Sequence, residues 1–148
     1  MTYVNEYRFR LERVGRVCER PPTVSAPVDA LPVLRALLDG KDREHFVAVA
    51  LNVRNQVIGT HIVSIGSLAA SIVHPREIFA FAIERRAFSL ILGHNHPSGD
   101  CTPSRDDVGL TRRLVQAGQI MGIEILDHII VSDWGDGDFL SMKERGLL

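Results

Sequence analysis

Cysteine is scarce in this sequence, and long hydrophobic runs are missing. Cys18 and Cys101 lie far apart and form no C-x-x-C pair, so neither a disulfide framework nor a thiolate zinc site is expected. The apolar run 46–51 falls far short of the about 20 residues that span a bilayer. The chain does not begin with a basic cap and an apolar stretch, so no secretory signal is predicted. These absences favour a cytoplasmic protein without membrane contact.

The chain also lacks an excess of charge of one sign. It has 17 basic and 18 acidic residues and a formal net charge of -1. Proteins that bind nucleic-acid backbones usually carry an excess of lysine and arginine, so strong duplex binding is not expected. Five arginines gather near the N-terminus: Arg8, Arg10, Arg13, Arg16 and Arg20. Glutamates are interleaved there, which favours a solvated face and leaves a local nucleic-acid contact open.

The 148 residues, of which 45% are hydrophobic and 24% charged, are typical of one compact domain with its own core. Periodicity predicts strands over 3–17, 45–51, 56–64, 89–92 and 123–132, and helices over 27–38, 75–86 and 104–122. This alternation favours an α/β fold. We expect residues 1–26, a strand followed by a proline-containing lead-in, to belong to the same domain as residues 27–148. Such an exposed strand could pair with a second copy, but the oligomeric state is not predicted.

The densest polar cluster follows the strand expected over 89–92. His94 and His96 lie two residues apart, and the strand period of two projects both imidazoles from one side. Asp107 follows in the first turn of the next helix. Two neutral imidazoles and a carboxylate are three ligands for Zn²⁺, and they leave the fourth position open for water. An open position is typical of a catalytic zinc site, so the cluster predicts a hydrolase.

Simpler interpretations exist for the same residues. The pair Ser104 and Asp107 is typical of a helix cap, with an acidic residue in the first turn. A lone histidine at a strand end is more often a packing residue than a ligand. The spacing of His94, His96, Ser104 and Asp107 within one segment favours the metal site. Capping is compatible with it, because Ser104 can cap while Asp107 faces the ion.

A zinc hydrolase also needs a carboxylate that is not a ligand, to take a proton from water and return it to the leaving group. Glu44 stands just before the strand 45–51, and the end of that strand can place it beside the cluster of His94, His96 and Asp107. Glu77 and Glu84 compete for this role, but a helix with a solvated charged face explains both.

The segment 94–107 resembles the JAMM signature, E…H-x-H-x7-S-x2-D, of the JAB/MPN metalloproteases. Segments 74–77 and 126–130 are similar to the bacterial RadC branch of that family. The resemblance implies that His94, His96 and Asp107 bind one Zn²⁺ per chain, that Ser104 stabilises the oxyanion and that Glu44 is the general base. It also implies a central mixed β-sheet flanked by helices, the cytidine-deaminase-like sandwich. The implied activity is hydrolysis of amide bonds, including isopeptide bonds, in a protein or peptide substrate.

Longer RadC-like proteins carry an N-terminal helix-hairpin-helix module, for which residues 1–26 are too short. A DNA-maintenance accessory that binds or cuts nucleic acid without peptidase activity is the alternative function. A purely structural zinc domain is a third hypothesis, which the lack of a convincing fourth ligand disfavours. For Asp127 and His128 we expect a packing or supporting role rather than ligation. The substrate is not predicted, although the loop 66–70 is a candidate for specificity.

Overall fold

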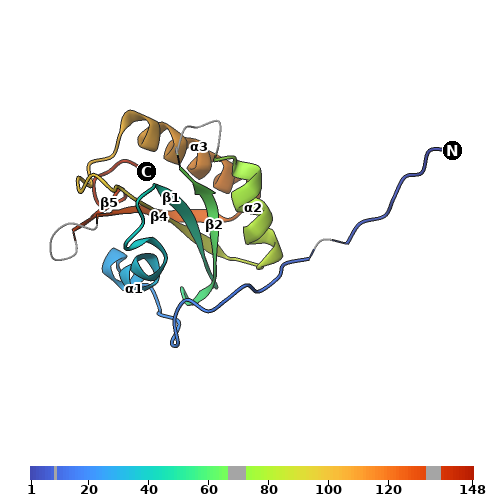
Figure 1. The fold of residues 1–148 in the computed structure, drawn as a ribbon, viewed down its shortest axis with the longest axis horizontal. Coiled ribbons are helices and arrows are strands. Elements are labelled where there is room, and N and C mark those ends of the chain that lie inside the picture. Colours follow the sequence, from blue (N-terminus) through green and yellow to red (C-terminus); the bar gives the residue numbers. More distant parts are fainter. Residues whose placement is uncertain (9, 67–72, 133–137) are drawn as a thin grey trace.

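The computed structural model describes residues 1–8, 10–66, 73–132 and 138–148. Its strands are β1 (His45–Leu51), β2 (Val57–Ile65), β3 (Ser89–Asn95), β4 (Glu124–Val131) and β5 (Phe139–Ser141), and its helices are α1 (Pro27–Leu38), α2 (Pro75–Glu84) and α3 (Arg105–Met121). The strands form one sheet in the order β2-β1-β3-β4-β5 (Figure 1). Strands β3 and β4 run parallel, and the other neighbours run antiparallel. The predicted α/β fold with a mixed sheet is confirmed.

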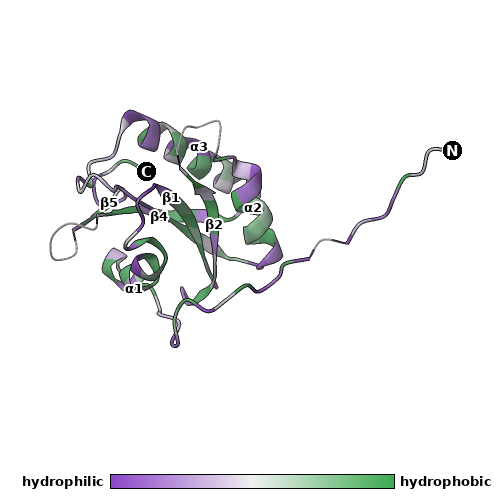
Figure 2. Cartoon of the chain, in the orientation of Figure 1, coloured by the Kyte–Doolittle hydropathy of each residue, from purple (hydrophilic) through white to green (hydrophobic). Residues whose placement is uncertain are grey.

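The sheet is covered on both faces. Helix α1 lies on one face, and helices α2 and α3 lie side by side on the other (Figure 1). Alternate residues of β1 serve the two faces, because successive side chains of a strand point to opposite sides. Val47 and Val49 pack in the cluster under α1, whereas Phe46, Ala48 and Ala50 pack in the cluster under α2 and α3. Colouring by hydropathy shows apolar residues along the central strands and polar residues on the outer helix surfaces (Figure 2).

Strand β3 is central and extends further than the sequence predicts. The predicted strand ended at Leu92, whereas β3 runs to Asn95 and is buried throughout. It continues because both of its neighbours continue: His94 pairs with Phe46 of β1 on one side and with Ile130 of β4 on the other. His94 therefore lies inside a hydrogen-bonded ladder, which fixes the direction of its side chain.

The close approach of α1 to β3 requires a glycine. A Cβ atom on Gly93 would come within 2.5 Å of Leu34 Cδ2 and 3.3 Å of Val47 Cγ2. Such contacts are too short for any side chain without movement of the neighbours. Gly93 therefore allows Leu34 to pack directly on the strand that carries the histidines.

Most other elements match their predicted bounds. Helix α1 has the predicted limits, with Pro27 at its first position. Helix α3 begins after Ser104 and ends at Gly122, whose positive φ of 71° suits glycine. Helix α2 ends at Glu84, two residues before its predicted end. The strands predicted over 45–51 and 56–64 are present as β1 and β2, which form an antiparallel hairpin. The three-residue strand β5, which pairs with β4, was not predicted because so short a segment carries no periodicity.

The strand predicted over residues 3–17 is wrong. Within the described part of that segment no residue is in a strand, and the chain leaves the domain as exposed backbone (Figure 1). Alternation of apolar and polar residues is insufficient, since a strand also needs partners for its backbone N–H and C=O groups. Further along the chain, an isolated bridge joins Thr23 to Gln56, the residue before β2. The expected pairing of a strand over residues 3–17 with a second copy loses its basis.

The loop 66–70, named above as a candidate for specificity, lies outside the described residues apart from Gly66. Among the helices that the structure describes, none is long and apolar enough to cross a membrane.

Candidate metal centre

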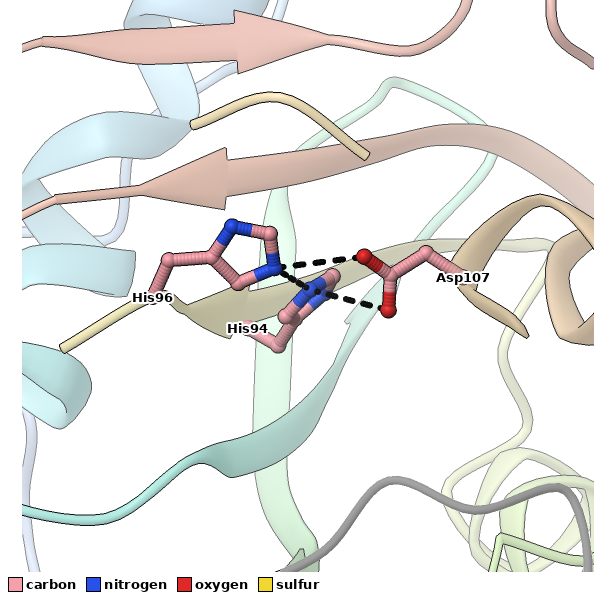
Figure 3. Close-up of side chains that lie close together, drawn as sticks. All are labelled: His94, His96 and Asp107. Carbon is pink, nitrogen blue, oxygen red and sulfur yellow. Dashed lines mark hydrogen bonds and ion pairs between the residues drawn. The ribbon is translucent and has the colours of Figure 1, made fainter. Parts of the chain in front are cut away.

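Three side chains converge where β3 ends and α3 begins (Figure 3). The Nε2 atoms of His94 and His96 are 2.9 Å apart. The carboxylate of Asp107 spans them, with Oδ1 3.4 Å from His94 Nε2 and Oδ2 3.2 Å from His96 Nε2. His94 is fully buried and Asp107 is 5% exposed. The predicted convergence of these three residues is confirmed.

The outer nitrogen of His96 is engaged away from this cluster. His96 Nδ1 lies 2.6 Å from the backbone carbonyl oxygen of Asp100. A carbonyl oxygen only accepts, so Nδ1 carries the proton and donates it. In the neutral imidazole the Nε2 lone pair then faces the Nε2 atom of His94 and the Asp107 carboxylate. This is the tautomer that a metal ion requires.

The centre attracts positive charge. Burial raises the pKa of Asp107, but the neighbouring His94 and His96 side chains and the hydrogen bond from Ser104 N–H outweigh burial and hold it well below its usual range. Burial lowers the pKa of His96, but the adjacent Asp107 carboxylate, the hydrogen bond to the Asp100 carbonyl and the charge of Glu44 together raise it above its usual value. The carboxylate is therefore ionised, and a proton or a cation between these groups is stabilised.

The donor set fits a divalent metal ion. Among the described residues no lysine or arginine forms an ion pair with Asp107, so its charge is not neutralised by a basic side chain. Two imidazole nitrogens and a carboxylate oxygen are ligands that Zn²⁺ takes in catalytic sites. Other first-row divalent ions bind the same donors, so the donor set supports a metal site without selecting the metal.

The predicted helix cap is confirmed, and it shares a residue with the centre. Asp107 N–H donates to Ser104 Oγ at 3.0 Å, and Ser104 N–H donates to Asp107 Oδ2 at 2.9 Å. The same Oδ2 faces His96. The cap therefore orients the carboxylate toward the histidines, so capping and metal binding are compatible. Ser104 itself is exposed beside the centre.

Glu44 lies at the rim of the centre. Phe46 of β1 pairs with His94, and Glu44 precedes Phe46 by two residues, just outside the paired part of the strand. Its side chain is half-buried. Its charge contributes to the raised pKa of His96, which is consistent with this placement.

Asn95 holds the segment that carries Glu44, a role that the sequence did not reveal. Its Nδ2 donates to the Arg43 carbonyl at 3.0 Å, and its Oδ1 accepts from His45 N–H at 2.7 Å. These two backbone groups flank Glu44. Asn95 is 1% exposed and lies between the two histidines on the opposite side of the strand. The sequence offered no signal for this role, because the predicted strand ended at Leu92, before Asn95.

The remaining carboxylates behave as expected. Glu77 is exposed and Glu84 half-exposed on α2, as the prediction of a solvated helix face requires. Asp127 is buried and accepts hydrogen bonds from the Ser141 hydroxyl and from Lys143 N–H, so it anchors the C-terminal turn. Its expected packing role is confirmed.

His128 is completely buried behind His94, with its Nε2 2.6 Å from His94 Nδ1. Burial lowers the pKa of His128 well below 6.5, so this ring is neutral. Its position agrees with a supporting role rather than ligation. Its partner Thr111, whose hydroxyl contacts His128 Nδ1 at 2.6 Å, was not predicted.

Fold and site define a small α/β domain with a candidate metal centre of two histidines and one aspartate at the end of a central strand. A family model described as RadC-like JAB domain matches residues 24–147. The chain belongs to the RadC-like JAB family.

Curated relatives agree with this assignment. A UPF0758 protein of Desulforamulus reducens is 52% identical over 125 residues, which cover 84% of this chain and 54% of that protein. A second, from Caldanaerobacter subterraneus subsp. tengcongensis, is 54% identical over 124 residues, covering 84% of this chain and 52% of its own length. A third, from Moorella thermoacetica, is 59% identical over 107 residues, or 72% of this chain and 45% of its own. The chain thus spans about half the length of these relatives.

Proposed function

We propose that this domain is a zinc-dependent hydrolase of amide bonds, a metallopeptidase or isopeptidase that acts on a protein or peptide. The observation that carries the proposal is the set of His94, His96 and Asp107 donor atoms, which lie within 4.8 Å of one another. Membership of the JAB family supports the same chemistry.

His94, His96 and Asp107 would hold one Zn²⁺ per chain, and three protein ligands leave a position open for water or substrate. When bound, zinc lowers the pKa of water to about 7 and polarises a carbonyl group. The buried ligands and their hydrogen bonds supply a site whose geometry is set before any substrate arrives.

The chain's own groups complete the reaction. The Glu44 carboxylate takes a proton from the attacking water and then returns it to the leaving nitrogen, so that one residue serves as base and acid in turn. Asn95 keeps the backbone on both sides of Glu44 fixed to β3. The Ser104 hydroxyl, whose proton is not needed for the helix cap, donates to the carbonyl oxygen as it gains negative charge.

The test compares Glu44→Gln with the wild-type protein on two substrates: a mixture of unfolded peptides and an isopeptide-linked model compound. Newly formed termini are counted by mass spectrometry, and the zinc content of each protein is measured. Loss of a general base costs about 10²–10⁴-fold in rate, and we expect the zinc content to remain unchanged.

Arg43→Gln is the matched control, because it changes an exposed neighbour while keeping the backbone carbonyl that Asn95 binds. This control should keep wild-type activity. Full activity of Glu44→Gln would remove Glu44 from this role, and the lack of cleavage by zinc-loaded wild type on either substrate would contradict amide hydrolysis.

A further inference from the structure

A chain of hydrogen bonds leads from one candidate metal ligand to another through two residues outside the ligand set. His94 Nδ1 lies 2.6 Å from His128 Nε2, and His128 Nδ1 lies 2.6 Å from Thr111 Oγ1. The Thr111 hydroxyl donates to the backbone carbonyl of Asp107 at 2.7 Å. All four residues are buried. The chain therefore starts on His94 and ends on the backbone of Asp107.

The acceptor at the end of this chain sets the direction of every proton in it. The Asp107 carbonyl only accepts, so it takes the single hydroxyl proton of Thr111. The Thr111 oxygen then accepts from His128 Nδ1–H. A neutral imidazole has one N–H, so His128 Nε2 is an acceptor and receives the Nδ1–H of His94. The Nε2 lone pair of His94 is thereby directed at His96 and the Asp107 carboxylate.

We propose that His128 and Thr111 are positioning residues that hold His94 in the ring orientation and the tautomer that bind the metal ion. Outer partners of this kind raise the metal affinity of a site because they remove the alternative orientations of the ligand. The inference shares the metal centre with the proposed hydrolase function, but it does not require that amide bonds are cleaved.

His128 does not serve as a fourth ligand in this arrangement. It contacts the Nδ1 atom of His94, whereas the other candidate ligands contact Nε2. The two nitrogens of an imidazole point in different directions, so His128 lies behind His94 as seen from the centre. Phe46 packs against both rings, nearly parallel to His94 at 10° and edge-on to His128 at 72°, and restricts their rotation.

Strand β4 departs from regular pairing where it delivers His128. Leu90 pairs with Ile125, but the next residue, Ile91, pairs with Asp127, so one extra residue is inserted in β4. Ile125 and His128 consequently face the same side, although they are three residues apart. In a regular strand they would face opposite sides. The irregularity is what brings the ring behind His94.

The first readout is zinc affinity, measured by competition with a chelator. Replacement of an outer partner typically costs about 10–100-fold in affinity, which we expect for His128→Leu. Thr111→Val keeps the shape of the side chain and removes the hydroxyl, so we expect a smaller loss of the same kind. We expect His128→Gln to retain more affinity than His128→Leu, since an amide supplies one acceptor and one donor.

Ser89→Ala is the matched control. It removes a buried hydroxyl from the other end of β3, where the hydroxyl has no hydrogen-bond partner among the described residues. We expect its zinc affinity to equal that of the wild type. Urea unfolding of each metal-free protein establishes that the variants are folded, and Thr111→Val and His128→Gln keep the test available if His128→Leu does not fold.

The second readout is the tautomer of His94, obtained from ¹⁵N NMR of the metal-free protein. We expect the proton on Nδ1 in the wild type and a gain of the Nε2–H form in His128→Leu, which a loss of packing alone would not cause. Unchanged affinity and tautomer in His128→Leu, or an equal loss of affinity in Ser89→Ala, would overturn the inference. Zinc-bound wild type that cleaves no amide bond would contradict the proposed function alone, whereas a wild type that binds no metal would overturn both.

Discussion

The two faces of the sheet are built from alternate residues of the same strands, yet they differ in chemistry. Under α1, Val47, Val49 and Ile91 pack against Leu34 in an apolar cluster. On the opposite face the residues of β3 begin as apolar and end at His94, which belongs to the candidate metal centre.

This difference separates two requirements that conflict: a stable apolar core and a buried polar site that can bind a metal ion. Buried polar groups cost free energy unless they are paired, and a set of lone pairs that faces inward remains unpaired until a cation arrives. The apolar face offsets that cost because it anchors the strand from behind through Gly93 and Leu34. We infer that the face under α1 supplies stability and the face under α2 and α3 supplies chemistry.

Leu34→Ala should give the largest effect on stability. Truncation of a fully buried leucine costs about 2–5 kcal/mol, because apolar contacts are lost and a cavity remains. Urea unfolding of the metal-free protein measures this loss. Under conditions where the variant stays folded, its zinc affinity should equal that of the wild type. A large change in zinc affinity would show that the two faces are not separate.

Zinc should stabilise the folded protein by binding to His94, His96 and Asp107 on the face under α2 and α3. A ligand that binds only the folded state raises the free energy of unfolding by about 2.7 kcal/mol at a free concentration 100 times its Kd. Thermal unfolding with and without added zinc measures the effect. His96→Ala removes a ligand and should abolish the stabilisation; if this variant responds to zinc as the wild type does, the ion binds elsewhere.

Ser104→Ala tests the N-cap of α3, which Ser104 forms together with the metal-site residue Asp107. Loss of an N-cap hydroxyl costs about 1 kcal/mol of stability. Ser104→Thr keeps the hydroxyl and serves as the control in the same urea titration. Equal stability of Ser104→Ala and the wild type would mean that the cap does not stabilise the start of α3.

Removal of residues 1–16 should have the smallest effect. The described residues of this segment are exposed and lie away from both faces. Changes at such positions usually stay within about 0.5 kcal/mol. We expect the truncated protein to match the full chain in urea unfolding and in zinc affinity. A clear loss of either would place the segment on one of the two faces in solution.

The sequence predicts this molecule well where the determining contacts are local. Helix α1 follows from periodicity, and the Ser104 cap follows from a pair three residues apart. Within the centre, His94 and His96 follow from the strand period, and Asp107 from the helix start. Each of these signals is contained within a few residues of sequence.

The rest depends on contacts between distant segments. The full length of β3 depends on both neighbouring strands, and the absence of a strand over residues 3–17 reflects a missing partner rather than an unsuitable pattern. No role could be assigned to Asn95, and the partners of His128 could not be named, because those partners are brought near by the β1 register and by the irregularity in β4. No local pattern encodes that irregularity.

The most direct test of this account is the metal content of the freshly purified protein, measured by mass spectrometry of the metal beside a His94→Ala variant. We predict about one zinc ion per wild-type chain, because the three ligands are assembled within the fold, and none retained by the variant. Wild-type protein that carries no metal, and takes up none when zinc is added, would contradict the assignment of this face to metal chemistry.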